Sequence, residues 1–178
     1  MAKNFRRPGV LYTEGDAIKP CNVVKHHVED FARRMASVAE FKLGDDPAEI
    51  VERLGGSIHY ADLDEWASED GSIFIHGESD FDILLSHYTS PLRDRFTVAH
   101  ELGHYFLHSE QGSTPIIAHR KGSTRIEWEA NWFAAGLLMP SEPFKKYCEK
   151  HSDLARIAAK FGVSEDAARV RRDAICPK

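Results

Sequence analysis

Residues 91–108 read PLRDRFTVAHELGHYFLH, and they predict a helix that carries a metal-binding motif. The helix should begin at Ser90-Pro91, since serine is favoured at the N-cap and proline at the first helical position. His100 and His104 are four residues apart and so lie on one face, one turn apart, where both imidazoles can bind one ion. Glu101 lies beside them, where a carboxylate can take a proton from a water that the ion activates.

A catalytic zinc usually takes three protein ligands, so this motif needs a third from elsewhere. His108 continues the spacing, but it lies about 12 Å along the helix axis from His100, too far to bind the same ion as both histidines. The longer motif HExxHxxGxxH is absent, because Leu107 and Glu110 occupy its glycine and histidine positions. The remaining source is a carboxylate from the next helix.

That next helix is predicted from about Thr124 to Met139 and offers two glutamates. Glu127 shares a face with an apolar stripe and should point to the core, with Asn131 one turn later as a hydrogen-bond partner outside the ligand shell. Glu129 lies about 160° around the helix and is expected on the solvated surface. A capping box between Thr124 and Glu127 is the alternative for Glu127. These ligand types suit Zn²⁺ with water as the fourth ligand, and Mn²⁺ or another divalent ion is also compatible with them.

Upstream, the apolar pattern predicts an amphipathic helix over Val24–Val38 and a short capped helix from Asp46-Pro47. Three short runs predict strands: Ile58–Tyr60, Ser72–His76 and Ile83–Leu85. The expected fold class is α+β, with a small three-stranded, mostly antiparallel sheet and the HExxH helix packed on the second ligand-bearing helix. We expect the last of these strands to form a sheet edge beside the cleft, where an extended peptide can add as a strand.

The 178 residues suffice for one domain, which we divide into an irregular N-terminal arm (residues 1–22), a core (23–140) and a helical C-terminal segment (141–178). The C-terminal segment resembles a helix-turn-helix, with Gly162 at the turn and Ser164 capping the next helix, although Arg171 falls where that signature usually has an apolar residue. It carries nine Lys or Arg against six Asp or Glu. A cap on the core is favoured, and direct DNA binding is the alternative.

Composition limits the remaining possibilities. The net charge of −5 disfavours the whole chain as a nucleic-acid binder. Cys21, Cys148 and Cys176 have no CxxC spacing and are expected to be free thiols of a reducing compartment. The longest apolar run, Trp132 to Met139, is far too short to cross a membrane. A cytoplasmic protein with no membrane association is expected.

Two segments of the chain resemble the ImmA/IrrE family of metallopeptidases: RFTVAHELGH at residues 95–104 and ExxANxFAAxLLMP at residues 127–140. A weaker match, AKFGVS at residues 159–164, extends the likeness, which spans roughly residues 24–175. The resemblance implies a thermolysin-like active-site fold with His100, His104 and Glu127 as zinc ligands and Glu101 as the general base. It also implies a protein substrate, a helix-turn-helix transcriptional repressor whose cleavage relieves repression.

Two functional classes follow. The first is a zinc endopeptidase that acts on a protein partner. The second is a metal-stabilised regulatory or interaction protein that binds a repressor or DNA with little or no catalysis. Glu101 favours the first, because a purely structural zinc site is usually closed by a fourth protein ligand and needs no base.

Overall fold

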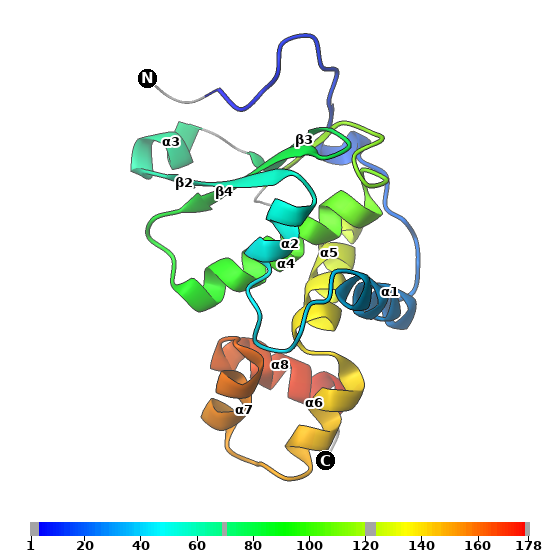
Figure 1. Ribbon diagram of the computed structural model, residues 1–178, viewed down its shortest axis with the longest axis vertical. Coiled ribbons are helices and arrows are strands. Elements are labelled where there is room, and N and C mark those ends of the chain that lie inside the picture. The colour runs from blue at the N-terminus through cyan, green and yellow to red at the C-terminus, as the bar shows by residue number, and fades with distance from the viewer. Residues whose placement is uncertain (1–3, 69–70, 120–123, 177–178) are drawn as a thin grey trace.

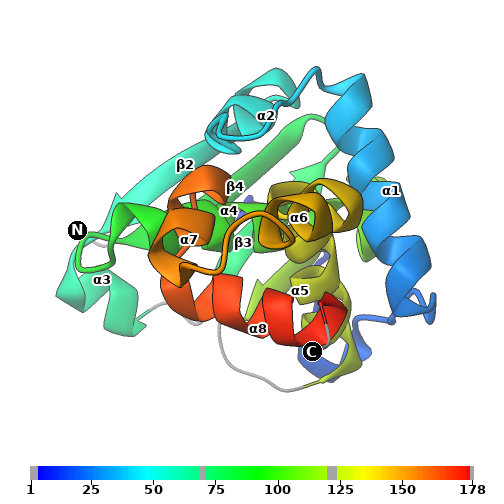
Figure 2. The ribbon, with the colours of Figure 1, turned by 90° about the horizontal axis from the view of Figure 1, so that it is seen from below.

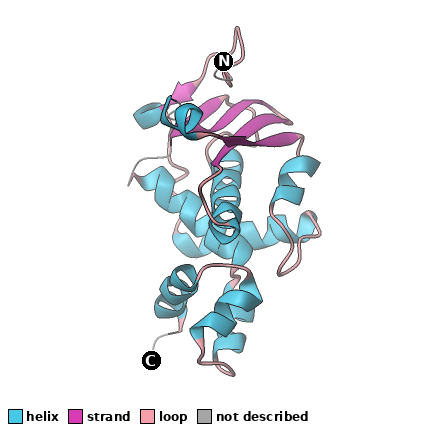
Figure 3. Cartoon of the chain, turned by 90° about the vertical axis from the view of Figure 1, so that its left-hand side faces the viewer, coloured by secondary structure: helices cyan, strands magenta, loops and turns pink. Residues whose placement is uncertain are grey.

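A mixed β-sheet lies at one end of the molecule, and most of the helices lie beneath it (Figures 1 and 3). The computed structural model describes residues 4–68, 71–119 and 124–176. The elements in chain order are β1 (Thr13–Glu14), a 3-10 turn (Gly15–Ala17), α1 (Lys25–Val38), α2 (Ala48–Arg53), β2 (Gly56–Ala61), α3 (Leu63–Ser68), β3 (Gly71–Gly77), β4 (Asp80–Ser86), α4 (Pro91–Leu107), β5 (Ile116–His119), α5 (Arg125–Leu138), α6 (Ser141–Cys148), α7 (Leu154–Phe161) and α8 (Glu165–Ile175).

The sheet has five strands in the order β1-β5-β3-β4-β2, so the prediction of three strands was too few. β3 is antiparallel to both neighbours, whereas β1 pairs with β5 and β2 pairs with β4 in parallel. The α+β class is confirmed, but the sheet is mixed. The predicted edge strand, Ile83–Leu85, lies in β4 between β3 and β2, so it has no free edge for a peptide.

Both faces of the central strands are covered, which is why their apolar residues run on instead of alternating with polar ones. Side chains of one face, among them Ile73, Ile83 and Ile116, join the core formed with the helices. The other face has a smaller cluster in which Phe5 packs on Phe74, and α3 adds Trp66 at its margin. The N-terminal segment, predicted as an irregular arm, therefore covers the sheet and supplies β1.

The two ligand-bearing helices cross at a glycine. A Cβ on Gly103 of α4 would lie 2.9 Å from the Cα of Ala130 in α5, so only glycine permits this approach. Ser90 caps α4 as predicted, since its hydroxyl accepts a hydrogen bond from the Arg93 backbone.

The C-terminal segment, which we call the tail, forms three short helices at the end opposite the sheet, nearest the viewer in Figure 2. Gly162 ends α7 with a φ of +62°, and Ser164 caps α8, both as predicted. Arg171, the residue that departs from the helix-turn-helix signature, is buried and donates to both carboxylate oxygens of Glu29 in α1. The tail is thus fastened to the core by an ion pair. No helix in the described part of the chain is both long and apolar enough to span a membrane.

Candidate metal centre

Three side chains from α4 and α5, those of His100, His104 and Glu127, bring atoms that can bind a metal ion to one point, and we call them the donor cluster. Nε2 of His100 lies 3.1 Å from Nε2 of His104, and the carboxylate oxygens of Glu127 lie 3.2 Å and 3.4 Å from these two nitrogens. Ligand atoms at tetrahedral positions, about 2.0–2.2 Å from a zinc ion, are about 3.3–3.6 Å apart. The spacing of the three donors fits a zinc ion between them, with one position left open.

The second nitrogen of each ligand ring is also engaged. Nδ1 of His100 lies 3.0 Å from Oδ1 of Asn131, and Nδ1 of His104 lies 3.0 Å from Nδ1 of His108. Such contacts orient a metal-binding imidazole and leave the lone pair of Nε2 free for the ion. The sequence predicted Asn131 as a partner of Glu127, whereas the structure pairs it with His100.

Glu101 is 2% exposed and belongs to the same cluster, in which one ligand atom of each of His100, Glu101 and His104 lies within 4.8 Å of the other two. It also lines the cleft that opens beside the two histidines. A buried carboxylate next to the open position can hold a water and accept its proton.

Glu127 remains ionised in this setting. Burial alone would raise its pKa, but the contacts of its carboxylate with His100 and His104 outweigh that effect and lower the pKa to about 2. Burial lowers the pKa of His104 to about 4, so that ring is neutral near pH 7. An ionised carboxylate and a neutral imidazole are the forms that bind metal. The Thr124 side chain makes no cap hydrogen bond, so the alternative role of Glu127 in a capping box has no support.

Glu129 is fully buried, and the prediction of a solvated surface residue was wrong. Helix α5 lies between α1 and α4, so the side opposite Glu127 also faces protein. The carboxylate of Glu129 lies 3.0 Å from Nε2 of His108 and accepts from the Arg125 guanidinium at 2.9 Å. The sequence excluded His108 as a ligand of the same ion and identified no other role for it, yet the structure places it against His104.

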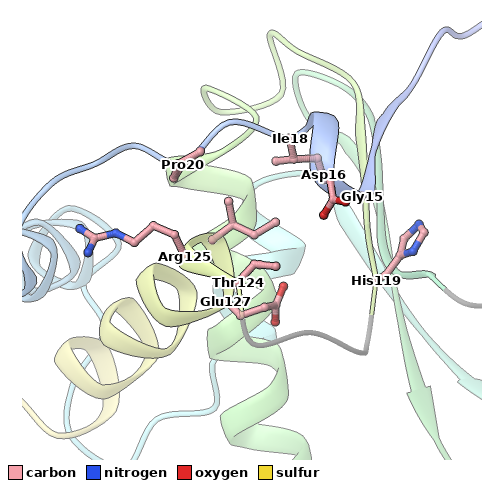
Figure 4. Close-up of a pocket in the computed structure, with 9 residues that line it drawn as sticks. Gly15, Asp16, Ile18, Pro20, His119, Thr124, Arg125 and Glu127 are labelled. Carbon is pink, nitrogen blue, oxygen red and sulfur yellow. The ribbon is translucent and has the colours of Figure 1, made fainter.

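The N-terminal segment completes the surroundings of Glu129. The backbone amides of Cys21 and Asn22 donate to its two oxygens at 2.9 Å each. Figure 4 shows this segment crossing the start of α5, with Glu127 directed to the right of the helix and Arg125 to the left, away from Glu127. The two glutamates of α5 therefore point to opposite sides of the helix. Glu127 contacts His100 and His104, whereas Glu129 contacts His108 and the N-terminal segment.

Glu127 lines two pockets. The first is the cleft beside His100, whose lining includes Trp66 of α3, Ser72 of β3 and Phe96 of α4. The second is lined by the 3-10 turn, His119 and the first residues of α5 (Figure 4). The carboxylate that approaches the two histidines therefore borders both pockets.

The helices that carry the donor cluster lie within a part of the chain that matches a known family. The sequence profile of the peptidase M78 family, described as an IrrE N-terminal-like domain, matches residues 51–172. No curated protein matches the sequence. Among solved structures, a Mycobacterium tuberculosis transcriptional regulator is similar with a TM-score of 0.58 and 17% identity, over 89% of this chain and 49% of the regulator. At this identity the likeness shows a shared fold, and the chain spans about half the length of that regulator.

Proposed function

The chain belongs to the peptidase M78 family of IrrE N-terminal-like proteins, and on this basis we propose that it is a zinc-dependent endopeptidase. The observation that carries the proposal is the convergence of His100, His104 and Glu127 within 3.4 Å of one another. These three residues would hold the ion. When bound, zinc polarises a peptide carbonyl and makes water nucleophilic near neutral pH.

The protein's own residues supply the proton transfers. Glu101 accepts the proton of the attacking water and then gives it to the nitrogen of the leaving peptide. Its burial in the cleft, beside the open position of the donor set, places it within reach of both. Asn131 holds the imidazole of His100 in orientation through its contact with Nδ1.

The substrate we propose is a helix-turn-helix transcriptional repressor that is cleaved to relieve repression. Family membership and the resemblance of the two motifs to ImmA/IrrE proteins support this choice. The similar solved structure is a transcriptional regulator, which is consistent with a role in regulation. The cleft beside His100 and the second pocket that Glu127 lines suit an extended peptide better than a small molecule.

A regulatory protein that binds DNA through its tail is the second candidate, and the structure gives it less support. Arg171 is buried against Glu29 and is unavailable to phosphates. On the outer side of α8, Arg169 pairs with Asp166, and Arg172 lies near Asp173. We propose that the tail is a cap on the core.

The test uses Glu101→Gln, which keeps the size of the side chain and removes the base. Both proteins are loaded with zinc and incubated with the helix-turn-helix regulators encoded beside the gene, and products are identified by mass spectrometry. We expect equal zinc content and a loss of cleavage rate of at least about 10²–10⁴-fold.

Glu110→Gln is the matched control, since Glu110 is exposed just beyond the end of α4. It should cleave at the wild-type rate, and a chelator should stop both. Wild-type cleavage by Glu101→Gln would refute the role of Glu101. Zinc-loaded wild type that binds these regulators without cutting them would favour the regulatory candidate.

A further inference from the structure

A chain of buried hydrogen bonds connects the donor cluster to the N-terminal segment. It runs from His104 through His108 to Glu129, with 3.0 Å at each step, and all three side chains are fully buried. Histidine and glutamate side chains are seldom buried together, because each of their polar atoms then needs a hydrogen-bond partner within the protein. The proposed mechanism uses only the first of them as a ligand.

The direction of each hydrogen bond follows from Glu129. Its ionised carboxylate only accepts, and three donors already fix it: the Cys21 and Asn22 amides and the Arg125 guanidinium. The Nε2 atom of His108 must therefore be the donor to Glu129.

The direction of the hydrogen bond between His104 and His108 follows from this assignment. A neutral His108 that carries its proton on Nε2 has a lone pair on Nδ1, the atom that lies 3.0 Å from Nδ1 of His104. Nδ1 of His104 then donates to Nδ1 of His108. A neutral His104 with its proton on Nδ1 has a lone pair on Nε2, and Nε2 is the atom that faces His100 and Glu127.

We propose that His108 and Glu129 are positioning residues that hold His104 in the tautomer and orientation needed to bind the metal. This inference rests on the proposed function, in which His104 is a zinc ligand. It assigns a purpose to two residues that touch neither the ion nor the substrate. Loss of such partners typically lowers metal affinity by about 10–100-fold.

The chain also contains a matched control for burial itself. His76 lies on the other face of the sheet, its side chain is 1% exposed, and its Nε2 lies 3.0 Å from a carboxylate oxygen of Asp82. Its second nitrogen contacts the Tyr12 hydroxyl. His76 and His108 therefore have equivalent burial and equivalent carboxylate partners, but only His108 contacts a proposed ligand.

The experiment measures the zinc dissociation constant by competition with a chelator, together with the unfolding midpoint of each metal-free protein. His108→Leu should bind zinc about 10–100-fold more weakly than wild type. His108→Gln should recover most of the affinity, because its amide oxygen can accept from His104 while its NH₂ group donates to Glu129. His76→Leu should lower the unfolding midpoint and leave zinc affinity unchanged.

Each outcome is informative. If His108→Leu binds zinc as tightly as wild type, or His76→Leu loses as much affinity, the positioning role is wrong and the proposed function stands. If wild type binds no zinc, the proposed function fails, and this inference fails with it. If metal-free His108→Leu is unfolded, the isosteric variant Glu129→Gln is used in its place. We expect Glu129→Gln to bind zinc more weakly than wild type, and an unchanged zinc affinity would overturn the proposal.

Discussion

Gly103 lies directly against the backbone of Ala130: a Cβ on Gly103 would be 2.9 Å from the Ala130 Cα and 3.1 Å from its carbonyl oxygen. This contact lies between His100 and His104 along α4 and one turn from Glu127 along α5. It therefore sets how far the two histidines are from the carboxylate, and any added atom must push the helices apart at the donor cluster.

Gly103→Ala should therefore destabilise the protein although alanine favours helix. The gain in helix propensity is about 1 kcal/mol, and overpacking of a tight contact costs about 1–3 kcal/mol. We expect a net loss in urea unfolding and a weaker zinc affinity. Gly136→Ala is the control, because its Cβ would meet the backbone of Glu29 at 2.7 Å, between α1 and α5. It should lose stability as well, with a much smaller effect on zinc.

Asn131→Ala should weaken zinc binding by removing the oxygen that accepts from Nδ1 of His100. Asn131 is exposed, so the free energy of unfolding of the metal-free protein should change little. The expected loss of affinity is about 10-fold, at the lower end for an outer partner of a ligand. Chelator competition checks it, and Asn131→Asp, which keeps an acceptor oxygen, should retain the affinity. Unchanged binding by Asn131→Ala would show that His100 needs no such support.

Glu29 should make stability depend on pH. Burial would raise its pKa, but the Arg171 ion pair outweighs this effect and lowers it below the ordinary 4.5. The ionised form is thus favoured by folding, so its contribution is complete above about pH 4.5 and is lost as pH falls through the lowered value. Glu29→Gln leaves Arg171 buried without its partner and should cost about 3 kcal/mol at pH 7.

Urea unfolding with chelator present measures this difference at several pH values. The gap between wild type and Glu29→Gln should shrink below pH 4, where the wild-type carboxylate takes up a proton. A gap that stays constant down to pH 2 would contradict the ion-pair explanation of how the tail is held.

Tyr12→Phe should loosen the N-terminal segment from the sheet. The Tyr12 hydroxyl accepts from the Arg7 backbone amide at 2.9 Å and lies 2.6 Å from Nδ1 of His76. Its removal leaves a buried ring nitrogen without this partner, a cost of about 1–3 kcal/mol. We expect faster tryptic cleavage after Arg6, since the bond after Arg7 precedes Pro8 and resists trypsin. Tyr88→Phe, at an exposed side chain, should be cleaved by trypsin at the wild-type rate. Equal rates of tryptic cleavage for the two variants would refute the prediction.

The site was more predictable from sequence than the sheet, and the reason is periodicity. His100, His104, Glu127 and Asn131 lie at helical spacings on two well-marked helices, so their faces follow from geometry. β5 was missed because Ile116–His119 is only four residues long and follows a loop rich in turn residues. β1 has two residues, too few for any pattern.

Glu129 could not be assigned from angle alone. A residue opposite Glu127 is exposed to solvent only if nothing packs on that side of α5. The N-terminal segment, which is distant in sequence, covers that side. One signal was available: buried residues such as Phe133, Gly136 and Leu138 occupy more than one face of α5, which is typical of a helix enclosed by protein.

The pairing of Thr13 with Ile116 joins strands roughly a hundred residues apart, and this has a consequence for how the chain folds. Contacts so distant in sequence close late, because the loop entropy must be overcome before they contribute. During synthesis, the first strand has no partner until β5 has emerged from the ribosome. The segment that supplies the two amides behind Glu129 thus docks among the last parts of the molecule, after the helices it supports have been made.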